Sequence, residues 1–406
     1  MPFLILRDTG LPIEAPTFWI TAHRRAMGSQ PNTLFNELRS LMLLYLYADL
    51  RDIDIAERLS EGDFLELTEI IDLVNLCGWY LDDVLAALDR RTSNVITLAR
   101  HIPKAGVQSG EKRNRLSVIR SFIEFTSAGH LSRLQAFPDR WALYRDMRKE
   151  CLDYLTTYIR GIGAPNRDDV GKRKGLNPEV LKRLRTVIDP DHPENPFERQ
   201  VRFRNFVMIM LFIELGIRRG ELLGIKVDDC DVAGERGFVT IHRRPDDVSQ
   251  TRFGVATKTV ARKLELSRRT TQLVYEWIVY HRRQLPNATK GKDQYLIVTI
   301  PKANPMSSSN VNKTFEALRE RVPGLPADVK PHVLRHSWND TFSDWMDKKG
   351  ISAEDEVKWR KKIMGWRSDA TAQHYTRRTV EHRSNQVLRE MHDNLDIRLP
   401  SEKDNA

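Results

Sequence analysis

The stretch that decides the fold lies near the C-terminal end and reads Lys330-Pro331-His332-Val333-Leu334-Arg335-His336. After a helical spacer come Met364-Gly365-Trp366 and then His374-Tyr375-Thr376. His332 and Arg335 are three residues apart, so they share one face of a helix. Pro331 suits the first position of that helix, where no backbone N–H is needed. Two donors on one turn, with a tyrosine after a Gly-Trp pair, are typical of the anion-binding and nucleophile half of a phosphoryl-transfer site.

A second half lies upstream and reads Leu215-Gly216-Ile217-Arg218-Arg219-Gly220-Glu221-Leu222-Leu223, with an arginine at the start of an amphipathic run. Between the two halves, Thr257-Lys258-Thr259 and Arg262-Lys263-Leu264-Glu265-Leu266 predict two short strands around a turn.

In order, residue type and spacing, these segments resemble the tyrosine recombinase (phage integrase) family. Its motifs run Gly-x-Arg-x-x-Glu-Leu, a hairpin lysine, His-x-Leu-Arg-His, Gly-His or Gly-Trp, and tyrosine. The resemblance covers residues 177–380 and implies six catalytic residues, which are Arg218, Lys258, His332, Arg335, Trp366 and Tyr375.

The resemblance gives Arg218 and Arg335 the role of clamping the non-bridging oxygens of a phosphodiester. Guanidiniums suit this role because they stay protonated and form bidentate charged hydrogen bonds. Arg219 competes with Arg218, but the family motif puts its arginine two residues after the glycine. His332 would hydrogen-bond the scissile phosphate and assist proton transfer. Glu221 would orient an arginine or balance its charge.

Lys258 would protonate the leaving 5′ oxygen, with Lys263 as the competitor on the same hairpin. We favour Lys258 because its stem starts nearer the turn. Trp366 stands where most family members have histidine, and its indole N–H keeps a donor there. Tyr375 would be the nucleophile, giving a 3′-phosphotyrosyl DNA and a free 5′ hydroxyl. That linkage keeps the bond energy, so rejoining would need neither ATP nor a metal.

Each of these residues also has a purely structural interpretation. A single arginine is usually a surface charge, and a histidine can be a half-buried structural residue. His332 and His336 have the spacing of a zinc pair, but no glutamate follows the first histidine and no third ligand is near. We therefore expect no metal and no cofactor, with His336 in a supporting or packing role.

The length of 406 residues favours two domains. We expect a mainly α protein with a small β-sheet, in which a helical DNA-clamping domain precedes an α+β catalytic domain of the tyrosine recombinase kind. The expected divisions are an N-terminal extension (1–30), a helical domain (31–160), a linker (161–176), a catalytic domain (177–396) and a disordered tail (397–406).

Within these divisions the patterns predict individual elements. Residues 3–6 and 17–20 are predicted as short strands, and a helix is predicted from Pro31 with Asn32 or Thr33 as its cap. Further helices are expected at 64–76, 81–89, 111–126, 140–160, 206–215, 269–283 and 310–322, at a start on Asn177-Pro178-Glu179, and after Pro331. Strands are expected at 238–241, 253–257 and 263–266.

The charge distribution favours a polyanionic partner. The net charge is +10, but residues 1–89 hold 6 Lys and Arg against 15 Asp and Glu, so the excess positive charge lies downstream. Three widely spaced cysteines indicate neither a disulfide framework nor a zinc cluster. With no apolar run of transmembrane length and no signal peptide pattern, we expect a cytoplasmic, nucleoid-associated protein and no membrane partner.

The resemblance implies double-stranded DNA with a specific site as the partner, and it leaves room for accessory proteins. The tail after Tyr375 has apolar residues at near-helical spacing, namely Val380, Val387, Leu388 and Met391. In the family such a helix joins subunits, so we expect a homotetramer on paired sites. Two alternatives are a catalytically silent DNA-binding regulator derived from an integrase, and a type IB topoisomerase. None of the six motif positions is lost, and the motifs and tail favour the recombinase.

Overall fold

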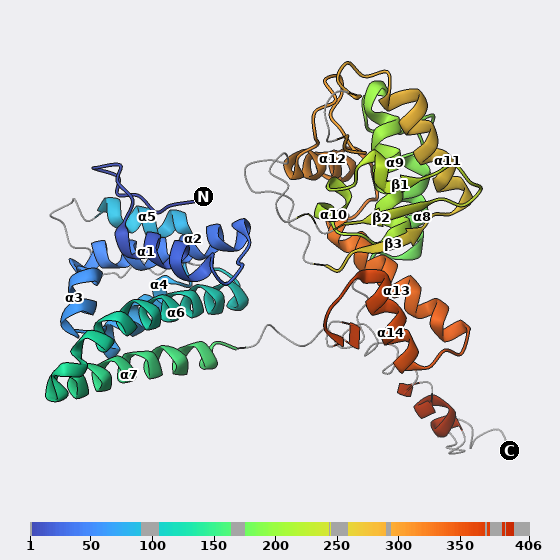
Figure 1. The fold of residues 1–406 in the computed structure, drawn as a ribbon. Coiled ribbons are helices and arrows are strands. Elements are labelled where there is room, and N and C mark those ends of the chain that lie inside the picture. The colour runs from blue at the N-terminus through green and yellow to red at the C-terminus, as the bar shows by residue number, and fades with distance from the viewer. Residues whose placement is uncertain are drawn as a thin grey trace. The chain divides into compact units, whose positions relative to one another are not determined.

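The structure is a computed structural model that describes residues 2–90, 105–163, 175–242, 244, 259–289, 294–369, 372–373, 384–385 and 387–393. The chain divides into two compact units, an N-terminal unit (Met1–Asp168) and a C-terminal unit (Asp169–Ala406) (Figure 1). In the described parts of both units, no helix combines the length and the apolar character that crossing a membrane requires.

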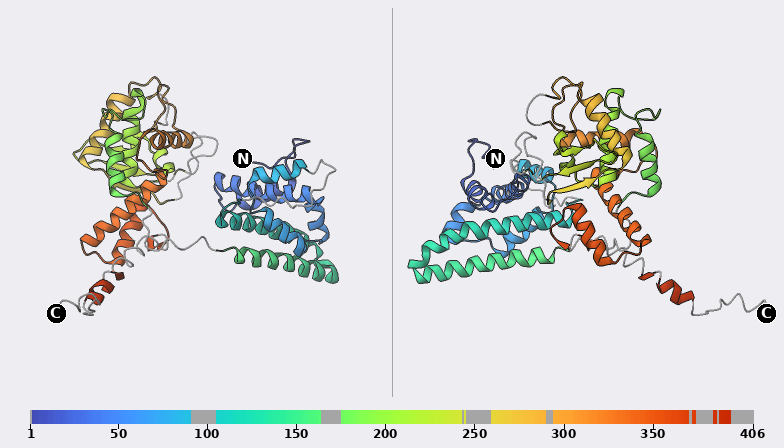
Figure 2. Two further views of the ribbon diagram at one scale, coloured as in Figure 1. Left: turned by 180° about the vertical axis from the view of Figure 1, so that it is seen from behind. Right: turned by 45° about the vertical axis from the view of Figure 1, so that its right-hand side comes forward.

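The N-terminal unit is a bundle of helices around one apolar core. Its helices are α1 (Glu14–Phe18), α2 (Pro31–Arg51), α3 (Ile55–Glu61), α4 (Leu67–Leu76), α5 (Leu81–Arg90), α6 (Ser109–Arg133) and α7 (Pro138–Gly161), with a π-helical turn at Trp19–Arg24 and a 3-10 turn at Leu134–Ala136. The two longest, α6 and α7, run antiparallel and side by side (Figures 1 and 2).

The strand predicted at residues 17–20 is wrong, because this segment continues α1 into the π-helical turn. Trp19 and Ile20 are adjacent in sequence yet both are buried, which strand alternation does not allow. The Trp19 ring packs edge-on against Phe122 at a centroid distance of 5.9 Å. Tertiary packing therefore overrides the local β preference of these bulky residues.

Most of the other helices in this unit lie where the sequence predicts them, with ends shifted by a few residues. One cap is wrong, because α2 begins at Pro31 itself and Gln30 is the N-cap residue. One helix, α3, was not predicted; it starts at Asp54, whose carboxylate accepts hydrogen bonds from the backbone N–H groups of Ala56 and Glu57. In the N-terminal segment, only an isolated bridge between Ile5 and Pro12 has β geometry.

The C-terminal unit combines helices with a small sheet. Its elements are α8 (Pro178–Val187), α9 (Arg199–Leu215), α10 (Arg219–Leu223), β1 (Cys230–Asp231), β2 (Phe238–Ile241), β3 (Arg262–Glu265), α11 (Arg268–Glu276), α12 (Ser308–Arg321), α13 (Pro331–Lys348) and α14 (Ala353–Met364), with a 3-10 turn at Val227–Asp229 and a π-helical turn at Trp277–Arg282. The expected start of α8 is confirmed, since Asn177 caps it by accepting from the Glu179 N–H.

The sheet is antiparallel with the strand order β1-β2-β3. Strand β2 pairs with β3 so that Thr240 lies opposite Lys263 and Ile241 opposite Arg262. The strand predicted at 253–257 lies outside the described residues. The expected fold class, mainly α with a small β-sheet, is confirmed.

Helix α9 forms the centre of this unit, with α10, α11 and α13 packed on it (Figure 2). It is buried on most of its surface because its sequence from Phe206 to Leu215 is apolar on nearly every face. The helix ends at Gly216, as predicted, and this residue has a positive φ of 57°. A Cβ atom on Gly216 would lie 2.7 Å from Cγ of Trp338, so only glycine lets α13 approach this closely.

Candidate active site

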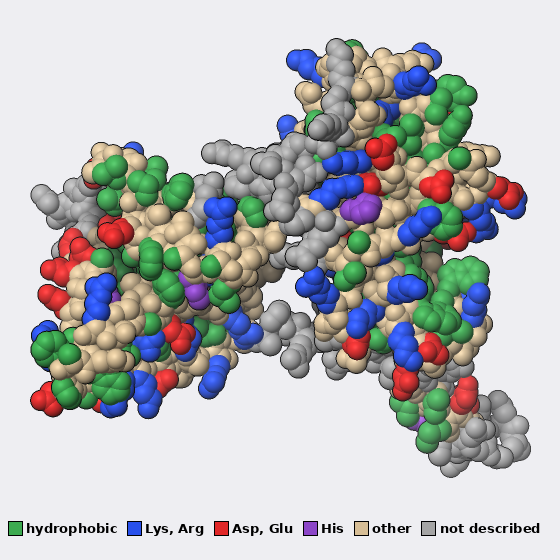
Figure 3. Space-filling view, in the orientation of Figure 1, with side chains coloured by type: hydrophobic (Ala, Val, Ile, Leu, Met, Phe, Trp, Pro, Cys, Tyr) green, Lys and Arg blue, Asp and Glu red, His purple; other side chains and the backbone are tan. Residues whose placement is uncertain are grey.

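A cleft of about 610 Å³ opens between the start of α10, α12 and the start of α13. Its lining is strongly basic and comprises Arg218, Arg219, Gly220, Asn312, Phe315, Glu316, Arg319, Lys330, Pro331, His332 and Arg335. On the face of the C-terminal unit seen in Figure 3, Lys and Arg side chains gather around a patch of His surface. Such a concave, cation-lined surface attracts anionic groups.

Arg218 enters this cleft as the N-cap residue of α10. Its backbone N–H donates to Oε2 of Glu221 at 2.8 Å, which fixes the turn between α9 and α10. The Arg218 side chain is partly exposed, and its Nη1 lies 3.6 Å from Oε1 of Glu221. This Nη1 donates no hydrogen bond to any residue in the described part of the chain. Nη1 is buried on the side of Glu221, but the side chain as a whole is 39% exposed, so its other N–H groups have donor capacity for a ligand in the cleft.

Arg335 lies one turn into α13 and is only 3% exposed. Its Nη1 donates to the Gly216 carbonyl at 2.7 Å, and its Nη2 lies 3.5 Å from the Met364 carbonyl. These carbonyls stand at the C-terminal ends of α9 and α14, where helix dipoles favour a cation. The guanidinium also lies over the Trp366 ring, 5.4 Å from its centroid. Two helix ends and one indole ring thus hold a buried guanidinium at the edge of the cleft.

His332 lies in the first turn of α13 with its ring open to the cleft. Partial burial of the ring lowers the pKa of His332, and the nearby guanidiniums of Arg335 and Arg218 lower it further. Its Nε2 is 2.9 Å from Nε2 of His336, so one imidazole donates a hydrogen bond to the other. In the described part of the chain, no third His, Cys, Asp or Glu joins this pair in a group that could hold a metal ion.

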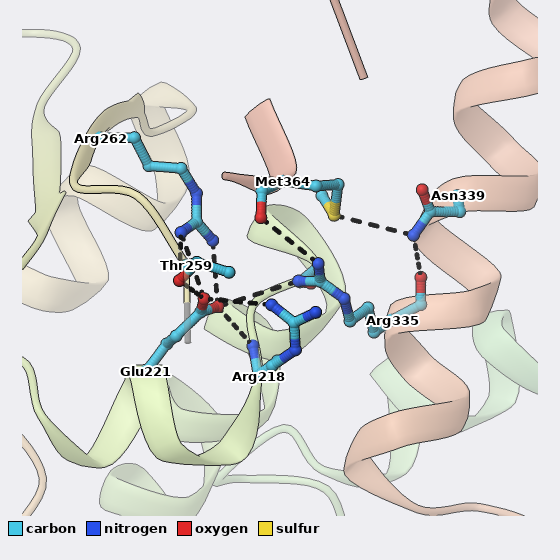
Figure 4. A network of polar contacts seen from close by, with 8 residues as sticks. Arg218, Glu221, Thr259, Arg262, Arg335, Asn339 and Met364 are labelled. Carbon is cyan, nitrogen blue, oxygen red and sulfur yellow. Dashed lines mark hydrogen bonds and ion pairs between the residues drawn. The ribbon is translucent and has the colours of Figure 1, made fainter. Parts of the chain in front are cut away.

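A buried carboxylate, Glu221, links these arginines (Figure 4). Its oxygens accept from both terminal nitrogens of Arg262, at 3.0 and 3.2 Å, and from the hydroxyl of Thr259. Oε2 also lies 3.8 Å from Nη1 of Arg335. Burial alone would raise the pKa of Glu221, but the Arg262 contact, the Thr259 hydroxyl and the Arg218 N–H together hold it below its ordinary value. We call Glu221, Arg262, Thr259, Arg218 and Arg335 the Glu221 cluster.

Trp366 reaches the site because α14 ends at Gly365, whose φ is +66°. A Cβ atom at Gly365 would lie 2.8 Å from Nη1 of Arg262 and 2.9 Å from the Val260 carbonyl. The Val260 N–H donates to the Gly365 carbonyl at 3.0 Å. The end of α14 is therefore fastened directly to the turn that precedes β3, with Trp366 buried beside it.

Four of the six site residues expected from the sequence, Arg218, His332, Arg335 and Trp366, are thus brought together. The other two, Lys258 and Tyr375, lie outside the described residues. Their flanking segments reach the same place, since Thr259 binds Glu221 and Ala372 packs with Trp366 in a small buried cluster.

The competing residues have other partners. Arg219 also lines the cleft, but its Nη1 donates to Asn312 Oδ1 at 2.6 Å rather than joining the Glu221 cluster. Lys263 is exposed on β3, and its Nζ lies 4.3 Å from the centroid of the Phe238 ring.

Arg262 was not singled out from the sequence. Strand alternation could have found it, because Arg262 lies two residues before the inward-facing Leu264 and so shares its buried face. A charged residue on that face requires a buried partner of opposite charge.

The chain matches the model of the phage integrase family over residues 176–382, about half of its length, and belongs to that family. Tyrosine recombinase XerA from Thermococcus kodakarensis is 26% identical over 209 residues, which are 52% of this chain and 60% of XerA. Transposase A from transposon Tn554 of Staphylococcus aureus is 20% identical over 337 residues, 83% of this chain and 81% of that protein. The chain thus spans about three fifths of XerA and four fifths of the transposase.

A solved structure of the Tn1549 transposon integrase in complex with transposon right end DNA superposes with a TM-score of 0.51 at 13% identity. The superposition covers 89% of this chain and 94% of that one, and it shows a common fold.

Proposed function

We propose that this chain is a site-specific DNA recombinase that cuts and rejoins strands through a 3′-phosphotyrosyl intermediate. The observation that carries the proposal is the convergence of Arg218, Arg335 and His332 on one basic cleft around the buried Glu221. The related transposase of Tn554 and the DNA-bound integrase of Tn1549 support a role in moving a DNA element by integration, excision or resolution.

In the proposed reaction, the hydroxyl of Tyr375 attacks the scissile phosphorus and the 5′ oxygen leaves. Charge then builds on the non-bridging oxygens, where Arg218 and Arg335 donate hydrogen bonds as fixed cations. Trp366 supplies an indole N–H beside Arg335. The pKa of His332 is lowered below that of an ordinary histidine, and because its Nε2 is hydrogen-bonded to His336, we propose that its Nδ1 exchanges a proton with the phosphate.

We propose Lys258, rather than Lys263, as the acid that protonates the leaving oxygen. Thr259 follows Lys258 directly, and its hydroxyl donates to Glu221, which also accepts from the backbone N–H of Arg218. Lys263 lies on the exposed face of β3 over Phe238, which supports a structural role for it. The divisions of the chain expected from the sequence, including the linker at 161–176, remain part of this proposal.

The proposal includes assembly into a tetramer on paired DNA sites. Helical residues 387–393 carry exposed Val387, Leu388 and Met391. A groove of about 1090 Å³ on α8, α9 and α13 has a lining in which apolar residues, including Trp338 and Trp345, stand among charged ones. The apolar residues of the groove can receive an apolar helix face, so we propose that the tail of one subunit docks in the groove of the next.

The test uses a duplex selected from a random-sequence pool for binding to the full chain. The duplex carries a nick near the scissile phosphate, and we call it the selected nicked duplex. After cleavage the short fragment leaves, so the covalent adduct accumulates. Arg335→Ala should lower the adduct rate by about 10²–10³-fold, because a fixed donor to the developing charge is lost. Adduct formation by the wild-type chain should be unaffected by EDTA.

The matched control is Arg282→Ala, which removes a similarly buried arginine that binds the Tyr295 and Ala288 carbonyls away from the cleft. At a temperature where both variants are folded, it should keep nearly the wild-type rate. Equal rates for the two variants would overturn the phosphate-clamp role of Arg335. Relaxation of any supercoiled plasmid by the monomer, without site preference, would favour a topoisomerase instead.

A further inference from the structure

Arg262 is the one member of the Glu221 cluster with two direct guanidinium hydrogen bonds to the carboxylate. Its side chain is 6% exposed and that of Glu221 is 1% exposed, so this pair is removed from solvent. Arg262 does not line the cleft, which Arg218 and Arg335 do. It therefore does not reach a bound phosphate in this arrangement, and it acts through the residues that it contacts, of which Glu221 is the one that carries charge.

The distances separate a close ion pair from two looser ones. Arg262 nitrogens lie 3.0 and 3.2 Å from the Glu221 oxygens, whereas Nη1 of Arg218 is 3.6 Å away and Nη1 of Arg335 is 3.8 Å away. Three guanidiniums thus surround one carboxylate. Since the closest one neutralises it, two positive charges remain at the edge of the cleft.

We infer that Arg262 is a positioning residue whose guanidinium balances Glu221, so that Arg218 and Arg335 keep their charge and orientation for the scissile phosphate. This inference rests on the proposed function. Without Arg262, the buried carboxylate would need another cation, and the next two in distance are Arg218 and Arg335. If the guanidiniums of Arg218 and Arg335 were drawn toward Glu221, they would turn away from the cleft. The cleft would then lose part of its positive charge.

Arg262 also packs against the segment that carries Trp366. Nη1 of Arg262 lies directly under Gly365, where an added Cβ would be 2.8 Å from it. Arg262 Nη1 is also 3.3 Å from the Thr259 hydroxyl, which it helps to orient toward Glu221. One guanidinium thus touches three separate segments that meet at the site.

The experiment compares wild type, Arg262→Met and the double variant Glu221→Gln/Arg262→Met on the selected nicked duplex. Arg262→Met leaves one net positive charge in the cluster, and we expect adduct formation to slow by about tenfold to hundredfold. The double variant removes one charge of each sign and restores two net positive charges. Its adduct rate should be at least tenfold higher than that of Arg262→Met, although it carries two substitutions instead of one.

A second substrate tests the charge argument directly. A methylphosphonate replaces one charged non-bridging oxygen of the scissile phosphate, located from the wild-type adduct, by a neutral methyl group. Because less charge then develops, the gap between wild type and Arg262→Met should shrink several-fold on this duplex. A merely structural role would slow both substrates equally.

Two controls separate the outcomes. Arg262→Lys keeps a cation beside Glu221 and should act within about tenfold of wild type, since one charged contact replaces two. Circular dichroism confirms that each variant is folded. A double variant no faster than Arg262→Met, or an undiminished gap on the methylphosphonate, would overturn the inference alone. Absence of any wild-type adduct would overturn the proposed function as well.

Discussion

At the residue scale, two glycines position the guanidinium of Arg335. Gly216 and Gly365 both have positive φ and end the helices whose terminal carbonyls face Arg335. Gly365 packs on the backbone carbonyl of Val260 as well as on the Arg262 side chain, whereas Gly216 packs on the Trp338 side chain. A side chain at this position would have to displace the turn before β3 or the start of the Trp366 segment.

We expect Gly365→Ala to lower both stability and adduct formation. The left-handed backbone costs about 1–2 kcal/mol for a residue with a Cβ atom, and the clash with the Val260 carbonyl adds to it. Gly350→Ala is the matched control, because Gly350 has a φ of +64° but no atom within 4 Å of its added Cβ. Thermal melts should show the backbone cost in both variants. Adduct rates should show a loss of cleavage in Gly365→Ala alone. Equal cleavage would contradict the fastening role of Gly365.

The sequence alone identifies the residues whose chemistry is carried by type and spacing. Arg218, His332, Arg335 and Trp366 could be singled out in this way. Strand alternation could place Arg262 on the buried face of β3, but it could not identify the partner, because Glu221 is distant in sequence. The pairing of charges across the core depends on tertiary structure, which local patterns do not specify.

At the element scale, α13 presents His332 and Arg335 because a buried polar network holds it to α14. Glu356 and Arg360 lie one turn apart on α14 and are fully buried as an ion pair. Arg360 also donates to the Ser343 hydroxyl, and it lies 3.3 Å from Oδ1 of Asn339. Both of these partners are on α13. Asn339 in turn donates to the Arg335 carbonyl at 2.8 Å, which connects the network to the clamp.

Glu356→Gln should therefore loosen α13 strongly. Removing one partner of a buried pair leaves an uncompensated charge and costs about 3–5 kcal/mol. Lys358→Ala is the control, since Lys358 forms an exposed pair with Asp355 on the same helix. Hydrogen exchange of α13 amides in the full chain measures the opening free energy, and only Glu356→Gln should accelerate it. Unchanged exchange would mean that the network does not support α13.

The elements themselves are predictable where amphipathic periodicity and a cap agree, as for α8. For α9, the apolar run predicts the end at Gly216 but not the start at Arg199. The failures have physical causes. Residues 17–20 are bulky and locally β-like, yet Trp19 and Ile20 both enter the helical core. Helix α3 is too short for its periodicity to stand out, and its cap at Asp54 is the stronger signal.

At the scale of the whole molecule, the proposed assembly depends on the segment that follows Tyr375. Helical residues 387–393 have an exposed apolar face, and the C-terminal unit has a groove in which apolar residues stand among charged ones. The sequence predicts the apolar stripe of the tail but not the groove, since residues from α8, α9 and α13 come together only in the folded unit.

Truncation after Thr379 should leave binding to a single site intact and slow strand exchange between paired sites, because only the connection between subunits is lost. Trp345→Ser should have the same effect, since Trp345 lines the groove and is 56% exposed. Trp359→Ser is the control, because Trp359 is exposed at 46% but does not line the groove. Gel shifts on one site and recombination assays on two sites separate the steps. Full-rate recombination by the truncated chain would show that the tail does not join subunits.

The central claim is covalent attack by Tyr375, and the most direct measurement is the mass of the adduct formed on the selected nicked duplex. The wild-type chain should carry one DNA strand on a peptide that contains Tyr375, and Tyr375→Phe should bind the duplex normally without forming any adduct. Tyr280→Phe, which removes an exposed tyrosine hydroxyl elsewhere in the C-terminal unit, should form the adduct at the wild-type rate. A covalent adduct trapped on the Tyr375→Phe chain would contradict the account.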